Sequence, residues 1–205
     1  MTLQNGGKLA KIISFLFHPL LMPTIGVLII FTTSYFAYLP REIKRLVTLV
    51  TFTGTFLFPV SIIPLFIYFK WVQRLEMGTY RERIIPLLFT SIMYYLTFVV
   101  LRKMPVPGII HSFILACAVG VFLNLLITFR WMISSHLIGI GGILGLVIML
   151  SVTEQVDVTL YLVASILVFG LIAYARLKLH AHTPLQVYTG FFLGFLITSL
   201  IVFFK

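Results

Sequence analysis

Charged residues are scarce in this sequence. They make up 10% of its 205 residues, whereas soluble domains carry about 25%. Hydrophobic residues reach 60%, and the mean hydropathy is +1.13. A water-soluble fold could not bury so much apolar surface, so the composition excludes a soluble domain and indicates a membrane protein.

Alternating strands are missing as well. The apolar runs are 17 to 30 residues long without a period of two, whereas the strands of a transmembrane barrel are short and alternate. A helix needs about 20 residues to cross a bilayer. The sequence therefore predicts an all-α, polytopic transmembrane helical bundle of six to seven spans, with 1–205 as a single integral membrane domain. The seven candidate spans are 10–38, 46–69, 85–101, 108–129, 132–152, 159–175 and 184–204.

Proline and glycine are placed where they shape these spans. Pro19 and Pro23 interrupt the first span and predict a kink there. Small-residue stripes in the fifth and seventh spans favour close helix packing over a phosphate loop. The glycines concerned are Gly139, Gly141, Gly142, Gly145, Gly190 and Gly194.

Cysteine and acidic residues are few. Cys117 is the single cysteine, which excludes a disulfide framework and a zinc cluster of the cysteine type. The chain has only five carboxylates. Magnesium and manganese sites prefer oxygen ligands, so this small number argues against such a site. A zinc site would need His136 in addition to His180 and His182. We expect no metal and no other cofactor, with metal-dependent catalysis as the open alternative.

Positive charge exceeds negative charge, and the formal net charge is +10. The basic residues form short clusters between apolar runs, which is typical of interfacial anchors and anion contacts rather than of a nucleic-acid-binding face. We therefore expect the bilayer and a lipid phosphate as partners, and no nucleic acid. The oligomeric state stays open.

Each span carries the chain to the other face of the membrane. The N-terminus, 70–84, 130–132 and 176–183 therefore share one face, which holds nine Lys and Arg residues against six on the other. The positive-inside rule would put this face in the cytoplasm. If Arg81, Arg83 and Arg176 serve a ligand, however, the count becomes six against six, and charge no longer gives the orientation.

Three polar clusters lie on this same face, in 74–83, 134–136 and 176–186. The arginine guanidinium is a planar fork of donors that matches phosphate oxygens. One histidine can attack phosphorus while a second, protonated histidine donates to the leaving oxygen. His136 and His182 could fill these two roles between them, whereas we expect His18 and His111 to be structural or interfacial.

The three clusters resemble the motifs of the type 2 phosphatidic acid phosphatases, which read Lys-x6-Arg-Pro, Pro-Ser-Gly-His and Ser-Arg-x5-His-x3-Asp. The third motif is matched by Ala175-Arg176, five residues, His182, three residues and Gln186. The second is matched by Ile133-Ser134-Ser135-His136. The first is matched by Arg74, six residues and Arg81-Glu82, and Arg83 followed by Pro86 could equally supply its arginine.

The resemblance covers about residues 70–195 and leaves 1–45 as an additional N-terminal helix region. It implies a membrane-embedded, metal-independent phosphatase acting on a lipid phosphate or polyprenyl diphosphate. His182 would form a phosphohistidine, and His136 would protonate the leaving alcohol. The implied phosphate ligands are Arg74, Arg81, Arg83, Ser134, Ser135 and Arg176. The expected location is the bacterial inner (cytoplasmic) membrane, with the site on the extracytoplasmic side.

Gln186 stands where the family has an aspartate that orients the nucleophilic histidine. A glutamine can accept a hydrogen bond but carries no charge. Glu76 or Glu82 could replace the missing carboxylate. The alternative is a catalytically inactive relative that binds or transports a phosphorylated lipid. A transporter unrelated to phosphate is disfavoured, because 46–69, 108–129 and 184–204 contain no charged residue.

Overall fold

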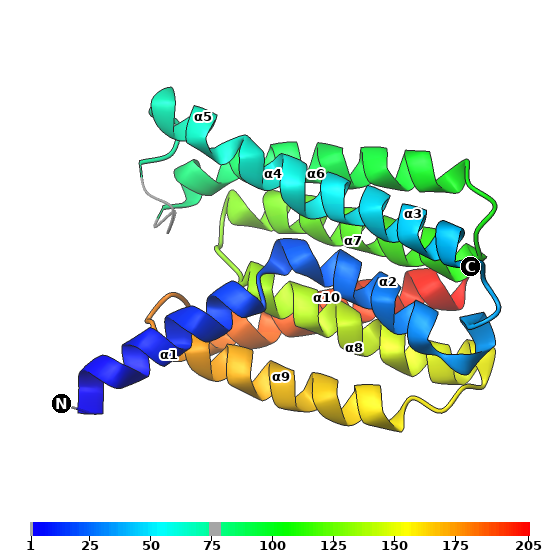
Figure 1. Cartoon of the computed structure of the whole chain (residues 1–205). Coiled ribbons are helices and arrows are strands. Elements are labelled where there is room, and N and C mark those ends of the chain that lie inside the picture. Colours follow the sequence, from blue (N-terminus) through cyan, green and yellow to red (C-terminus); the bar gives the residue numbers. More distant parts are fainter. Residues whose placement is uncertain (1, 74–78) are drawn as a thin grey trace.

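The computed structural model describes residues 2–73 and 79–205, and within these ranges every regular element is a helix (Figure 1). In chain order the elements are α1 (Thr2–Leu16), η1 (Pro19–Leu21), α2 (Met22–Thr32), η2 (Ser34–Phe36), α3 (Arg41–Phe52), η3 (Thr53–Leu57), α4 (Phe58–Ser61), α5 (Ile63–Tyr68), α6 (Tyr80–Arg102), α7 (Gly108–Thr128), α8 (Ser135–Glu154), α9 (Thr159–Lys178) and α10 (Pro184–Phe203).

Seven helical segments of the described chain are long and apolar enough to cross a bilayer. They are Gly6–Thr32, Arg41–Tyr68, Tyr80–Arg102, Gly108–Thr128, Ser135–Glu154, Thr159–Lys178 and Pro184–Phe203. The first combines α1, η1 and α2, and the second runs from α3 to α5. The predicted all-α polytopic bundle is thus confirmed, and the chain is an integral membrane protein.

The first two spans are interrupted, and their interruptions lie against each other. α1 ends at Leu16, and the chain continues through η1 into α2, so the predicted kink is a complete break. In the second span the π-helical turn η3 precedes Pro59, which has no N–H to donate to the preceding turn. The Thr55 hydroxyl in η3 donates to the carbonyls of Thr51 (2.8 Å) and Leu20 (3.4 Å).

α8 and α10 share the most extensive helix contact of the bundle. A Cβ placed on Gly194 would lie 2.0 Å from the Ile138 carbonyl oxygen, and one on Gly141 would lie 2.1 Å from the Phe191 carbonyl oxygen. Since real Cβ atoms do not approach so closely, only glycine allows these two backbones to touch. The predicted role of the small-residue stripes in helix packing is confirmed.

The connections divide between two ends of the bundle (Figure 1). One end gathers the beginning of α6, the α7–α8 connection and the α9–α10 connection, and we call it the site end. The opposite end carries the α2–α3, α6–α7 and α8–α9 connections and the C-terminus, where Lys205 pairs with Glu154. The predicted placement of 130–132 and 176–183 on one face is therefore confirmed.

Candidate functional site

The α9–α10 connection places Arg176 and His182 by two local motifs. At the end of α9, His180 N–H donates to the Leu177 carbonyl (3.0 Å) and Ala181 N–H donates to the Arg176 carbonyl (3.1 Å). His180 has the left-handed φ of 50° that such a helix ending requires. Three residues after His180, Thr183 caps α10, so the five-residue spacing between the arginine and the histidine covers one tight reversal between two helices.

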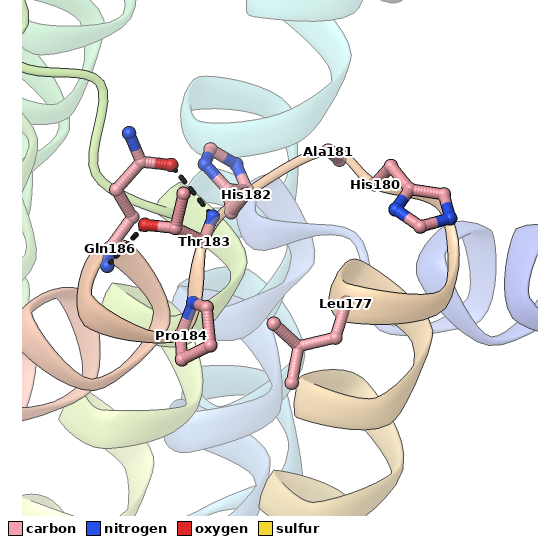
Figure 2. Close-up of a pocket in the computed structure, with 7 residues that line it drawn as sticks. All are labelled: Leu177, His180, Ala181, His182, Thr183, Pro184 and Gln186. Atoms are coloured by element: carbon pink, nitrogen blue, oxygen red, sulfur yellow. Dashed lines mark hydrogen bonds between the residues drawn. The ribbon is translucent and has the colours of Figure 1, made fainter.

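Gln186 belongs to the cap of α10. Its side-chain oxygen accepts from the Thr183 N–H (3.0 Å), and its own N–H donates to the Thr183 hydroxyl (3.4 Å), as Figure 2 shows. Together with Pro184 at the first helical position, this capping box begins the helix directly after His182. Gln186 therefore lies beside His182, but its oxygen is engaged by the backbone.

His182 is nearly buried, with 8% of its surface exposed, and its Nδ1 has no hydrogen-bond partner among the described residues. Burial, together with the positive charges of Arg83 and Arg176, lowers the pKa of His182 to about 4. Hydrogen bonding by the Gln186 side chain and the Met132 backbone acts in the opposite direction. The ring is consequently neutral near pH 7 and keeps a nitrogen lone pair, the form that a nucleophile needs.

An open pocket adjoins His182 at the site end. Its volume of about 400 Å³ falls within the range of small-ligand sites. It is lined by Leu177, His180, Ala181, His182, Thr183, Pro184 and Gln186. The histidine is therefore accessible from the end of the bundle despite its burial.

The candidate arginines differ in where they lie. Arg176 is half-buried, and its Nε has no hydrogen-bond partner in the described part of the chain. Arg83 is half-buried in the first turns of α6. Arg81 is exposed, and its Nε donates to the hydroxyl of Tyr80 (3.1 Å). Arg83 and Arg176 are thus brought to His182, Arg81 is not, and Arg74 lies outside the described residues.

The beginning of α8 supplies the serines and the second histidine. Ser134 is fully buried, and its N–H donates to the Gln186 carbonyl (3.2 Å), which ties the first turns of α8 and α10 together. The Ser134 hydroxyl has no partner among the described residues. The Ser135 hydroxyl accepts from the Asn124 amide (2.8 Å), so it is already engaged by α7. The positive charge of Arg176 acts on both His136 and His182, which indicates that all three groups share one site.

Glu82, one of the two acidic residues that could replace the aspartate of the resembled motif, is engaged by a helix cap. Glu82 completes a capping box at the start of α6, where its carboxylate accepts from the Thr79 N–H (3.3 Å) and the Gln73 N–H (3.1 Å). Glu76 lies outside the described residues. Among the described residues, the charges that act on His182 are those of Arg83 and Arg176.

The described side chains do not form a set of metal ligands. Within 2–73 and 79–205, no group of three or more His, Cys, Asp or Glu side chains could hold a metal ion. His180 is exposed, and Figure 2 shows it pointing away from His182. The zinc alternative, which required His136, His180 and His182 together, has no such ligand set here.

Three further residues reach the site without having been predicted. His136 Nε2 lies 3.1 Å from the Ser14 carbonyl oxygen, and the His136 and His18 rings are 5.8 Å apart. The buried Ser14 hydroxyl also lacks a partner within the described chain. Asn124, in α7, donates a hydrogen bond to the Ser135 hydroxyl at the start of α8. Two signals were available in the sequence, because the polar Asn124 and the ionisable His18 each lie inside an apolar span, where such groups are costly.

Comparison of the chain with protein-family models, with curated proteins and with solved structures finds no match.

Proposed function

We propose that this protein is a membrane-embedded, metal-independent phosphatase that hydrolyses a lipid phosphate or polyprenyl diphosphate through a phosphohistidine on His182. The observation that carries the proposal is the group of buried atoms without a partner in the described chain. Among such atoms, those beside His182 at the site end are the Ser134 hydroxyl, Arg176 Nε and His182 Nδ1 itself. Burying polar groups without a hydrogen-bond partner is costly. An anionic ligand with several oxygens would accept hydrogen bonds from the Ser134 hydroxyl and from Arg176 Nε–H together.

The electrostatics favour a phosphoryl group over a neutral ligand. Arg83 and Arg176 bring two positive charges to His182. α8 and α10 both begin at this site, joined by the bond from Ser134 to Gln186. Helix N-termini carry a partial positive charge and free N–H groups, which makes them anion sites. A dianionic phosphoryl group balances this concentration of positive charge.

The chemistry needs two histidines in opposite protonation states. Neutral His182 attacks phosphorus, the bond from phosphorus to the leaving oxygen breaks, and protonated His136 gives its proton to that oxygen. The leaving group is an alcohol for a lipid phosphate and the polyprenyl phosphate for a diphosphate. Water then attacks the phosphohistidine, returns a proton to His136 and releases inorganic phosphate. The arginines stabilise the charge on the phosphoryl oxygens throughout.

The position of the site favours a lipid substrate. The pocket opens at an end of a bundle whose sides present apolar residues, such as Leu160, Leu167 and Leu185. A phosphorylated headgroup can therefore occupy the polar end while its hydrocarbon tails remain beside the helices.

The second candidate function is binding or transport of a phosphorylated lipid without turnover. It is favoured by Gln186, whose side-chain oxygen is engaged by the α10 cap and which brings no negative charge to His182. Without a carboxylate, the cationic phosphohistidine that forms during turnover has less stabilisation.

Phosphate release in EDTA tests the proposal. The detergent-purified protein is incubated with a panel of lipid phosphates and polyprenyl diphosphates, alongside His182→Ala and the control His111→Phe, which removes a histidine at the opposite end of the bundle. We expect release by the wild type and by His111→Phe, and none by His182→Ala. Release that needs a divalent metal, or that survives in His182→Ala, contradicts the mechanism. Saturable lipid binding without release favours the second function.

A further inference from the structure

The broken first span reaches into the candidate site, although it lies outside the region that resembles the phosphatases. The break between α1 and α2 carries Ser14 and His18 past the first turn of α8. The His18 ring packs edge-on between Phe56 of η3 (6.4 Å between centroids) and His136 (5.8 Å). The breaks in the first two spans thus converge on His136.

The contact with Ser14 decides which nitrogen of His136 carries a proton. A carbonyl oxygen can only accept, so His136 Nε2, at 3.1 Å from it, must be the protonated nitrogen. In the neutral ring this leaves Nδ1 with the lone pair. When the ring is charged, the proton available for transfer is therefore on Nδ1.

His18 is held in a complementary way by its own backbone. Its Nδ1 accepts from the Leu20 N–H at 3.3 Å, as the N-cap of η1. A nitrogen that accepts carries no proton, so neutral His18 keeps its proton on Nε2. This hydrogen bond fixes the orientation of the His18 ring against His136. The same break in the first span follows the end of α1, where the Ser14 carbonyl contacts His136.

We infer that the first span is a positioning element of the active site, in which the Ser14 carbonyl and the His18 ring hold His136 with Nε2 protonated, so that Nδ1 transfers the proton. The proton transfer in this inference rests on the proposed phosphatase function, whereas the tautomer of His136 rests on the contacts alone. In the first step the Nδ1 proton goes to the leaving oxygen as its bond to phosphorus breaks. In the second step Nδ1 takes a proton from the attacking water, while Nε2 stays bonded to Ser14 throughout.

The test reads the tautomer directly. Nitrogen-15 NMR of the full chain, labelled at histidine and held in detergent, reports which ring nitrogen is protonated, and a His136→Gln sample assigns the resonances. We expect His136 to show a protonated Nε2 and an unprotonated Nδ1 above neutral pH. A protonated Nδ1 in the neutral wild-type ring overturns the inference, whether or not the protein turns over lipid phosphates.

Two substitutions separate positioning from packing. His18→Phe keeps a ring between Phe56 and His136 but removes the acceptor for Leu20, whereas His18→Asn keeps a capping oxygen without the ring. We expect His18→Phe to give mixed tautomers at His136 and to lower kcat on the order of 10- to 100-fold with little change in KM. We expect His18→Asn to retain more of the Nε2-protonated tautomer of His136, and more of the wild-type kcat, than His18→Phe does.

His111→Phe is the control, because His111 also bonds a carbonyl (Leu101, 2.9 Å) but lies at the opposite end of the bundle. It should leave the His136 resonances unchanged. Unchanged His136 resonances in His18→Phe overturn the role of His18. Absence of turnover in the wild type, with the expected tautomer present, contradicts the phosphatase proposal alone.

Discussion

Gly194→Ala is expected to destabilise the protein because it separates the two central helices. The new Cβ would lie 2.0 Å from the Ile138 carbonyl oxygen and 2.8 Å from its carbonyl carbon, whereas ordinary van der Waals contact begins at 3.4 Å. The obstructing atoms belong to the backbone of α8, so no side-chain rotation relieves the clash. α10 must move away from α8 as a unit.

The magnitude is the difference between two opposing effects. Overpacking a tightly packed contact typically costs about 1–3 kcal/mol. Replacing glycine by alanine within a helix returns roughly 1 kcal/mol through helix propensity. Because the obstructing atoms are backbone, the cost lies at the upper end of the first range, and we expect a net loss of about 2 kcal/mol. We also expect a loss of activity, because the same helix contact joins Ser134 to Gln186.

Gly170→Ala is the matched control, because Gly170 also lies within a helix but nothing is found within 4 Å of its added Cβ. It should gain about 1 kcal/mol from helix propensity. Thermal unfolding of both variants in the same detergent measures the contrast. If Gly194→Ala is as stable as Gly170→Ala, the backbones of α8 and α10 do not touch as described and the reasoning is refuted.

Three further predictions concern the α9–α10 connection. His180→Gly should raise stability by about 1 kcal/mol in thermal unfolding, because His180 has a φ of 50° that costs an L-residue but not glycine. The His182 contribution to stability should fall as the pH drops from about 6.5 towards 4, because the folded pKa is about 4 and the unfolded chain, with an ordinary pKa of about 6.5, binds more protons in that window. Denaturation at several pH values should show this slope in the wild type and its loss in His182→Ala. Gln186→Glu should keep the cap on Thr183 and raise the pKa of His182, so that the acidic limb of the pH–rate profile moves to higher pH.

Much of the fold could be predicted because each membrane helix is recognisable from its own stretch of sequence. Length and hydropathy locate all seven spans, and counting spans assigns the connections to two faces. The ends were less accurate where caps decide them. α6 begins at Tyr80 instead of 85, because Thr79 and Glu82 form a capping box whose pattern is readable in the sequence. The same pattern in Thr183 and Gln186 identifies Gln186 as part of a helix cap.

The site was harder to predict where it depends on tertiary packing. Arg81 and Arg83 are equivalent as motif residues, and the phase of α6 leaves one exposed and brings the other towards His182. Ser14 and His136 are 122 residues apart in sequence, so no local spacing relates them. Their contact depends on where the proline break carries the first span.

The most direct test of the central claim is to trap the intermediate. Protein mixed with a phosphate-labelled lipid substrate is denatured rapidly in alkali, where phosphohistidine survives, and the label retained on the chain is then tested for lability to acid. We expect acid-labile label on the wild type and on His111→Phe, and none on His182→Ala. Label that persists in His182→Ala, or phosphate release by the wild type without any labelled protein, would contradict the account.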